Sequence, residues 1–345
     1  MKLEKLLVCE FITAGGLGAE PLPDTLAKEG ALMRDALLCD LSELNQYQLI
    51  TMHDARLQPS VYAKNTMAVA TGDFLKVFKK ALKQADLVWI IAPETDGILL
   101  ELTALCLAAE DDEDGAIFLG CGYDASLVAT SKTLSFEALQ AADIHTLPVF
   151  GGEDLMQQAF LDAMSGLNVT KWVAKPEDGA GCDGIRVFDS LADLRDWLKQ
   201  DEQYLRYLAQ PFQQGITASF AMICRDGKGW LLSCNQQHIQ YDDSQFKLTG
   251  ISVNGMQAYW QRFETLARKV AKMLPDALGY IGVDVIVEPE SDRIFVIDIN
   301  PRLTSSYAGL REAIGHNPAR IILDCILQPN FKMPVLQKNM IEIKL

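Results

Sequence analysis

The chain has 345 residues, a formal net charge of −15 and a pI near 4.7. A chain of this length can bury a large core and divide into two or three domains. It carries no cluster of lysine and arginine that would neutralise a phosphate backbone, so we expect no nucleic acid partner. No apolar stretch reaches the length of about 18 residues that a spanning helix needs, and the start MKLEKLLVCEF lacks the apolar core and cleavage site of a signal peptide. We therefore expect a cytoplasmic protein without membrane association.

Eight cysteines are scattered along the chain, and none forms a C-x-x-C pair. Most lie in apolar runs, which is typical of reduced core thiols in a cytosolic protein and not of a disulfide scaffold or a zinc site. Cys182 differs because it lies in a glycine-rich segment. We interpret it there as a small loop residue and not as a catalyst.

The first part of the chain alternates apolar strand patterns with helical patterns. This rhythm predicts an α/β domain with a doubly wound parallel sheet over residues 1–125. Strands are expected at Leu6–Ile12, Gln48–Met52, Leu87–Ala92 and Ala116–Leu119, and helices at Asp24–Leu41, Asp73–Gln84 and Gly97–Glu110.

Ligands on such a sheet bind at the carboxyl ends of its strands, which singles out two loops. The first follows the first strand and contains Glu10, Gly15 and Gly16. The second is the segment PETDG, which begins at Pro93 and contains Glu94.

The middle part, residues 126–208, is expected to form a small lid with a glycine-rich loop. Its sequence WVAKPEDGAGCDGIRVF predicts a strand with Lys175, a loop with Gly179, Gly181 and Gly184, and a return strand. Glycines let a loop expose successive backbone N–H groups to an anion, so the loop is a candidate phosphate cradle. A Walker A loop would end in Gly-Lys-Ser/Thr and open a helix, and this loop does neither. A flexible hairpin tip has a similar composition and remains an alternative.

The last part, residues 209–345, is expected to be α+β, with an antiparallel sheet and a metal-binding hairpin. Asp298 and Asn300 alternate on the strand RIFVIDIN, and Asp284 lies 14 residues before Asp298 in another apolar run. That spacing allows the two aspartates to face each other across a hairpin. Two carboxylates and an amide oxygen suit Mg²⁺, or Mn²⁺ in its place. The alternative is a hairpin with solvated acids, against which the apolar flanks argue.

The order of these motifs resembles that of the ATP-grasp carboxylate-amine ligases. The resemblance rests on Lys175 before the glycine-rich loop, LAQPF ending in Phe212, and the closing D-I-N-P-R. It implies the ATP-grasp fold, an ATP-dependent ligase that forms an amide through an acyl phosphate, and ATP with Mg²⁺ at the site. Small-molecule carboxylate and amine substrates are implied as well. Lys132 lies where the family carries the first of two lysines that contact ATP.

The resemblance also implies roles for individual residues. Lys132, Lys175 and the glycine loop would bind phosphates, and Gln210, Pro211 and Phe212 would bind the adenine. Arg302, with Lys175, would act in catalysis by stabilising the charge of the reacting groups. Apart from the resemblance, we expect substrate at the two loops after the strands, with Glu10, Gly15, Gly16 and Glu94, and at the segment with Ser305, Ser306 and Tyr307. Of these, Glu10 or Glu94 would accept the ammonium of the amine.

Two positions depart from the family pattern. Asp298 stands where the second metal ligand is usually Glu, and Gly282 stands where several relatives have an arginine. The charge of the transition state must then be met by Arg302 and the two lysines. The shorter carboxylate leaves open a nucleotide-binding regulatory protein without turnover.

Within the superfamily, EFITAGGLG, LAKEGALMRDALLCDL and NPRLTSSYAGL look most like the tyramine-glutamate ligases of methanofuran biosynthesis. That narrower resemblance implies L-glutamate as the carboxylate and tyramine or tyrosine as the amine. A ligase of the same chemistry for another amino acid or a peptide is the alternative. Relatives are often dimers, so a homodimer is expected by analogy only.

Overall fold

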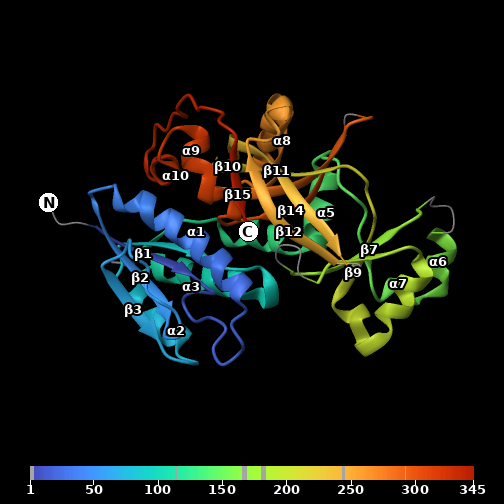
Figure 1. Ribbon diagram of the computed structural model, residues 1–345, viewed down its shortest axis with the longest axis horizontal. Coiled ribbons are helices and arrows are strands. Elements are labelled where there is room, and N and C mark those ends of the chain that lie inside the picture. The colour runs from blue at the N-terminus through green and yellow to red at the C-terminus, as the bar shows by residue number, and fades with distance from the viewer. Residues whose placement is uncertain (1–3, 113–114, 165–168, 180–183, 243–244, 292) are drawn as a thin grey trace.

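A computed structural model describes residues 4–112, 115–164, 169–179, 184–242, 245–291 and 293–345. Three parts follow one another along the chain (Figure 1): an N-terminal domain in blue, a small lid in green and yellow, and a C-terminal domain in orange and red. The lid comprises β6 to β9 with their helices. It lies at the far side of the C-terminal domain from the parallel sheet.

The N-terminal domain is built on a five-stranded parallel sheet with the order β3-β2-β1-β4-β5. The predicted doubly wound sheet is thus confirmed, with one strand more than expected. The strands are β1 (Glu4–Glu10), β2 (Tyr47–Asp54), β3 (Asn65–Val69), β4 (Leu87–Ile91) and β5 (Ile117–Phe118). The missed strand is β3 at the sheet edge, where only Val69 of the sequence NTMAV is buried, so the strand lacks a long apolar run. By contrast, β4 is buried along its whole length, as an inner parallel strand should be.

Helices cover both faces of this sheet. On one face lie α2 (Phe74–Leu82) and α3 (Ile98–Glu110), which enclose a core with Leu7, Cys9 and Val88. On the other lies α1 (Asp24–Ser42), whose leucines pack on β1 and also on the C-terminal domain. Because α1 shares one core with both domains, it fixes how they sit against each other.

The second sheet has ten strands, and its described pairings are all antiparallel. Its C-terminal part comprises β10 (Ile216–Arg225), β11 (Lys228–Asp242), β12 (Gln245–Val253), β13 (Gly279–Glu288), β14 (Arg293–Asn300) and β15 (Ile341–Lys344). The lid part comprises β6 (Phe150–Gly151), β7 (Trp172–Pro176), β8 (Arg186–Phe188) and β9 (Tyr207–Pro211). The two parts join where Gln245 of β12 pairs with Arg186 of β8.

The C-terminal sheet is also covered on both faces. One face carries α4 (Tyr123–Thr130), α5 (Lys132–Ala141) and α8 (Trp260–Met273), and Phe220 and Phe263 lie in the core between them. The other faces α1, α9 (Leu310–Ile314) and α10 (Pro318–Leu327). The last two helices are separate. Gly315 ends α9 at φ 69°, and Asn317 caps α10 through the backbone N–H of Arg320.

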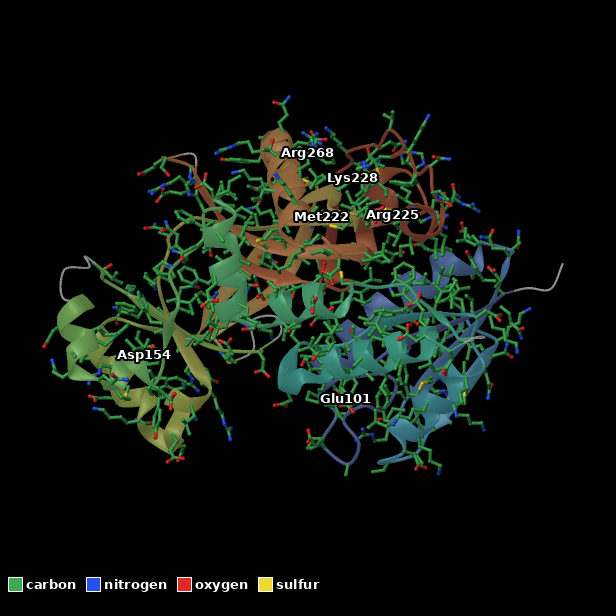
Figure 2. The ribbon with its side chains drawn as sticks, turned by 180° about the vertical axis from the view of Figure 1, so that it is seen from behind. Glu101, Asp154, Met222, Arg225, Lys228 and Arg268 are labelled. Atoms are coloured by element: carbon green, nitrogen blue, oxygen red, sulfur yellow. The ribbon has the colours of Figure 1, made fainter. Side chains whose placement is uncertain are left out.

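The lid has a small core of its own, which includes Leu155, Trp172 and Leu194. Its helices are α6 (Gln158–Met164) and α7 (Leu191–Leu198), with short 3-10 turns at Asp154–Met156 and Gln200–Leu205. Seen from behind (Figure 2), Asp154 of the lid lies far from Arg225 and Arg268 of the C-terminal domain. None of the described helices is long and apolar enough to cross a membrane.

Candidate active site

A pocket lies where the lid meets the C-terminal domain. It brings together four residues that are far apart in the sequence: Lys132, Lys175, Gln210 and Asp298. The remaining lining residues are mostly apolar: Ser135, Phe136, Leu139, Thr146, Val149, Leu208 and Ile297. The lining thus combines two lysines and a carboxylate with apolar side chains that suit a flat apolar ring.

Lys132 begins α5 and points at the glycine-rich loop. Its Nζ donates to the carbonyl oxygens of Glu177 and Gly179, at 3.3 and 3.1 Å. The carboxylate of Glu177 in turn accepts hydrogen bonds from the hydroxyls of Ser131 and Thr133. The start of α5 and the start of the loop therefore form one hydrogen-bonded unit, which holds the lysine beside the loop.

Of the predicted loop glycines, Gly179 and Gly184 are described, whereas Gly181 lies outside the described residues, as does Cys182. Gly184 has φ +71°, and a Cβ there would come within 2.9 Å of the Tyr207 hydroxyl. A side chain at this position would meet both backbone strain and a close neighbour.

The predicted adenine segment contributes one side chain to the pocket. Gln210 on β9 is buried and donates from Nε2 to the Leu147 carbonyl at 3.2 Å, which braces the segment behind the pocket. Pro211 pairs with Trp172 of β7, and the backbone N–H of Phe212 donates to Lys171. These two residues are not among the described residues that line the pocket.

The predicted carboxylate hairpin forms as expected. Asp284 of β13 and Asp298 of β14 are direct partners in the register, and Asn300 pairs with Gly282 two residues away. Residues two apart on a strand point to the same face, so the three side chains project together. Asn300 Nδ2 donates to Asp284 Oδ2 at 3.2 Å, and Gln237 Nε2 donates to its Oδ1 at 2.8 Å.

Burial, and next the charge of Asp298, raise the pKa of Asp284 to about 6. Two facing carboxylates with little solvent repel each other, and a divalent cation between them would relieve that repulsion. The set of carboxylate and amide oxygens matches what Mg²⁺ prefers. The residues present thus fit the metal that the hairpin predicted.

The packing around Gly282 explains why this position departs from the family pattern. A Cβ at this position would lie 2.4 Å from Cγ2 of Thr304. No larger side chain fits unless the segment after β14 moves, so an arginine at this position is excluded by Thr304.

Arg302 and Glu94, for which the sequence suggested separate partners, bind each other. Arg302 donates from Nε to Oε1 at 2.9 Å and from Nη2 to Oε2 at 2.7 Å, while Nη1 donates to the Leu303 carbonyl. The side chains are 11% and 4% exposed. Burial opposes the charge of Arg302, but Glu94, Glu29 and Asp298 outweigh it and raise its pKa. Within the part of the chain that the structure describes, one N–H on each Nη nitrogen has no partner and is open to an oxyanion.

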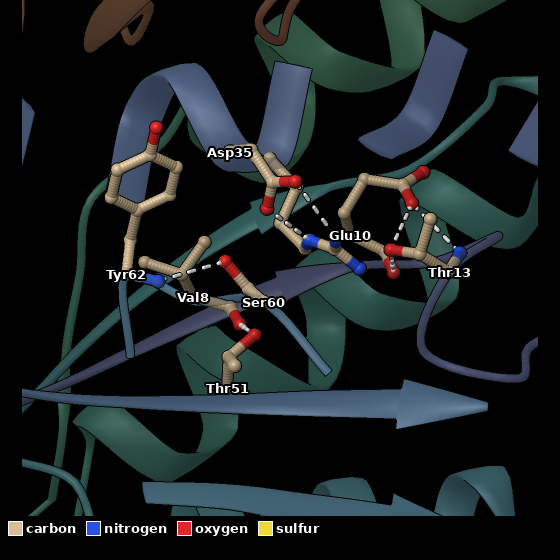
Figure 3. A network of polar contacts seen from close by, with 8 residues as sticks. Val8, Glu10, Thr13, Asp35, Thr51, Ser60 and Tyr62 are labelled. Atoms are coloured by element: carbon tan, nitrogen blue, oxygen red, sulfur yellow. Dashed lines mark hydrogen bonds and ion pairs between the residues drawn. The ribbon is translucent and has the colours of Figure 1, made fainter. Parts of the chain in front are cut away.

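Glu10 is enclosed by its own loop. Its carboxylate accepts hydrogen bonds from the Thr13 hydroxyl at 2.6 Å, the Thr13 N–H at 2.8 Å and the Ile12 N–H at 3.2 Å. Figure 3 shows Glu10 and Thr13 facing each other at the end of β1, with Asp35 of α1 nearby. A Cβ on Gly30 would lie 2.5 Å from Glu10 Oε2, so α1 covers this carboxylate closely. Burial raises the pKa of Glu10 despite these hydrogen bonds.

The two loop glycines are explained by the same packing. A Cβ on Gly16 would lie 2.3 Å from the ring of Phe11, and Gly15 has φ +87° beside Val69. The structure thus gives both glycines a role in closing the loop over the sheet, and their predicted contact with substrate stays a prediction.

The segment after β14 connects the domains through its hydroxyls. The Ser305 hydroxyl donates to Glu29 of α1, and the Tyr307 hydroxyl donates to Asp40 of α1 at 2.9 Å. Ser306 lies 3.3 Å from the Tyr280 hydroxyl. All three predicted residues are buried, and Tyr307 is 1% exposed. Tyr307 and Ser305 therefore both connect the C-terminal domain to α1, Tyr307 through Asp40 and Ser305 through Glu29.

Sequence reasoning missed Glu29. It lies on α1, is only partly buried and stands close enough to Arg302 for its charge to matter. Nothing in LAKEGALMRD distinguishes this residue from a solvated helix acid, so only the docking of α1 against Ser305 reveals it.

The glycine-rich loop also touches the N-terminal domain. The backbone N–H of Asp96, in the PETDG loop, donates to Asp178 Oδ2 at 2.7 Å. The start of the glycine-rich loop and the loop that carries Glu94 are thus joined by a hydrogen bond.

Comparison with known proteins agrees with this arrangement. A family model described as an ATP-grasp domain matches residues 129–306, and one described as a pre ATP-grasp 3 domain matches residues 47–125. The chain is 27% identical over 316 residues to a tyramine–L-glutamate ligase of Methanocaldococcus jannaschii, covering 90% of this chain and 86% of that protein.

Two solved structures show the same fold. One is an Archaeoglobus fulgidus protein assigned to the ATP-grasp superfamily, with a TM-score of 0.69, 21% identity and full coverage of both chains. The other is an L-amino acid ligase from Bacillus licheniformis, with a TM-score of 0.65, 12% identity and coverage of 95% of this chain and 75% of that one.

Proposed function

The chain belongs to the ATP-grasp family and is an ATP-dependent ligase that forms C–N bonds, and from this premise we propose that it activates a carboxylate as an acyl phosphate and transfers the acyl group to an amine. The observation that carries the proposal is the convergence of Lys132, Lys175 and Asp298 on one pocket beside the glycine-rich loop. Such a site supplies the charge neutralisation and positioning that phosphoryl transfer requires.

In the first half-reaction, ATP would occupy the pocket with its phosphates toward the lysines. Lys132 is already held at the loop by two carbonyl oxygens, and phosphate oxygens would take over its N–H donors. Asp284, Asp298 and Asn300 would hold Mg²⁺, which supplies charge neutralisation at the phosphates when bound. A substrate carboxylate then attacks the γ-phosphorus, and ADP leaves.

In the second half-reaction, the amine attacks the acyl carbon and phosphate leaves. The N–H groups of Arg302 that Glu94 and Leu303 leave open would bind the oxyanion of the tetrahedral intermediate. The contact of Asp178 with Asp96 would help to keep water from the acyl phosphate, which hydrolyses readily.

For the substrates we propose L-glutamate as the carboxylate and tyramine or tyrosine as the amine. The support is the similarity to tyramine–L-glutamate ligase over 90% of the chain, together with its resemblance in the loops around Gly15 and Ser305. Another amino acid or a peptide as substrate would leave the site chemistry unchanged.

The test is an incubation with ATP, Mg²⁺, glutamate and tyramine. ADP and phosphate should appear in step with γ-glutamyltyramine. Release of AMP instead of ADP would refute the acyl phosphate route. ADP formation with other amines and not with tyramine would keep the chemistry and replace the substrate. Tight ATP binding without turnover across an amine screen would favour a regulatory protein.

A cytoplasmic location fits this function, because ATP is available there. The cysteines in the described part of the chain are free thiols, and Cys39 alone among them is not fully buried. That pattern supports a reducing compartment. A homodimer remains an expectation by analogy.

A further inference from the structure

Glu29 places a carboxylate of the N-terminal domain at the edge of the catalytic residues. It lies on α1, and its Oε1 accepts a hydrogen bond from the Ser305 hydroxyl of the C-terminal domain. Ser305 follows Arg302 by three residues, and the charge of Glu29 acts on that guanidinium. Among the described residues, its second oxygen, Oε2, has no hydrogen-bond partner.

The two acids that the sequence suggested as partners of the ammonium are already engaged. Both oxygens of Glu94 accept from Arg302, and the residue is 4% exposed. Glu10 is 3% exposed and accepts three hydrogen bonds from its own loop beneath α1. Glu29 alone of these three is partly exposed and keeps an oxygen for a ligand.

A primary amine raises a chemical requirement that the lysines and Arg302 cannot meet. The amine is an ammonium ion near neutral pH and has no lone pair for attack until it loses a proton. Lysine and arginine side chains are themselves protonated and cannot accept it. A carboxylate both attracts the ammonium and accepts its proton.

We propose that Glu29 is the catalytic base of the second half-reaction, binding the ammonium of the acceptor and taking its proton. This inference rests on the proposed function, since it requires an acyl phosphate and an amine. The proton passes from nitrogen to Glu29, and the freed lone pair forms the C–N bond to the acyl carbon. The C–O bond to phosphate breaks, and the second proton of the nitrogen leaves with the phosphate. Ser305 positions the carboxylate through its hydrogen bond.

The test separates the two halves of the reaction by the choice of nucleophile. Hydroxylamine is neutral near pH 7 and traps an acyl phosphate as a hydroxamate without a base. In Glu29→Gln, kcat/KM for tyramine should fall about 10²- to 10³-fold. Hydroxamate formation from glutamate, ATP and hydroxylamine should stay within about threefold of wild type, with an unchanged KM for glutamate.

The control is Glu110→Gln, which removes an exposed acid at the end of α3 and should match wild type in both assays. Ser305→Ala keeps the base but loosens it, so it should lose less tyramine activity than Glu29→Gln. Melting temperatures show that each variant is folded.

Three results would overturn the inference. If Glu29→Gln retains wild-type activity with tyramine, no proton passes through Glu29. If hydroxamate formation falls as much as amide formation, Glu29 serves carboxylate activation instead. If the wild-type protein makes neither amide nor hydroxamate, the proposed function itself fails, and the base assignment with it.

Discussion

The ion pair of Glu94 and Arg302 connects the N-terminal domain to the segment after β14, so its loss should lower stability, and activity as well if Arg302 has its proposed role. The change is Glu94→Gln, which keeps the shape and removes the charge. Two charge-assisted hydrogen bonds, of 2.9 and 2.7 Å, are affected, and the side chains are 11% and 4% exposed. Removal of one partner from a buried pair costs about 3–5 kcal/mol, because the other charge stays buried without compensation.

The loss of free energy corresponds to a lowering of the melting temperature. An unfolding entropy of about 2.1 cal/mol/K per residue gives about 0.7 kcal/mol/K for the 345 residues. Glu94→Gln should therefore lower the melting temperature by about 4–7 °C when the chain melts as one unit. Circular dichroism of the protein without nucleotide measures it, and Glu110→Gln serves as the control.

A double variant distinguishes the ion pair from general disturbance. Glu94→Leu combined with Arg302→Met removes both charges and should be destabilised by less than the sum of the two single changes. A Glu94→Gln protein that melts within about 1 °C of wild type would refute the reasoning, since such a shift is expected of an ordinary surface substitution.

Three further predictions concern pH, metal and the glycine loop. Burial is the largest effect on Asp40 and raises its pKa to about 6. The folded state therefore binds the proton of Asp40 more tightly than the unfolded state does. The stability from this difference is fully present below about pH 4 and is lost as the pH rises through 6. In urea unfolding, the stability of wild type minus that of Asp40→Asn should fall by about 2–3 kcal/mol between pH 4 and 7, and a constant difference would contradict this. MgATP at about 100 times its Kd should add about 2.7 kcal/mol to the free energy of unfolding of the wild type. Asp298→Asn should lose the part of this gain that depends on Mg²⁺. If the wild type and the variant gain equally, Asp298 does not bind the metal. Gly184→Ala should cost about 1–2 kcal/mol from positive φ and more from its contact with Tyr207, so it should exceed Gly72→Ala, which has positive φ but no neighbour within 4 Å.

Much of the fold could be predicted because its strands and helices carry strong local patterns. All residues of β4 are apolar, and Asn317 followed by Pro318 is a typical start of a helix, as α10 shows. Strands such as β3 and β15 were not predicted, because they depend on partners elsewhere in the chain. Four residues of β15, Ile341 to Lys344, pair with Gly250 to Val253 of β12, which lie about 90 positions earlier in the chain, and no local pattern encodes that pairing.

The carboxylate hairpin was predictable for the same reason. Asp284, Asp298 and Asn300 lie on neighbouring strands, so alternation and a short turn place them together without long-range information. The pocket was predictable only in part, since Lys132 and Asp298 meet through the packing of α5 on the C-terminal sheet.

By itself, then, the sequence determined the parallel sheet, the order of the motifs and the facing carboxylates of the hairpin, because short-range spacing controls strand faces and turns. Only the tertiary structure decided which acid does what: Glu94 is taken by Arg302, Glu10 is enclosed beneath Gly30, and Glu29 is brought to Ser305. The physical reason is that a carboxylate's role depends on its burial and its partners, and both are set by how α1 packs between the two domains.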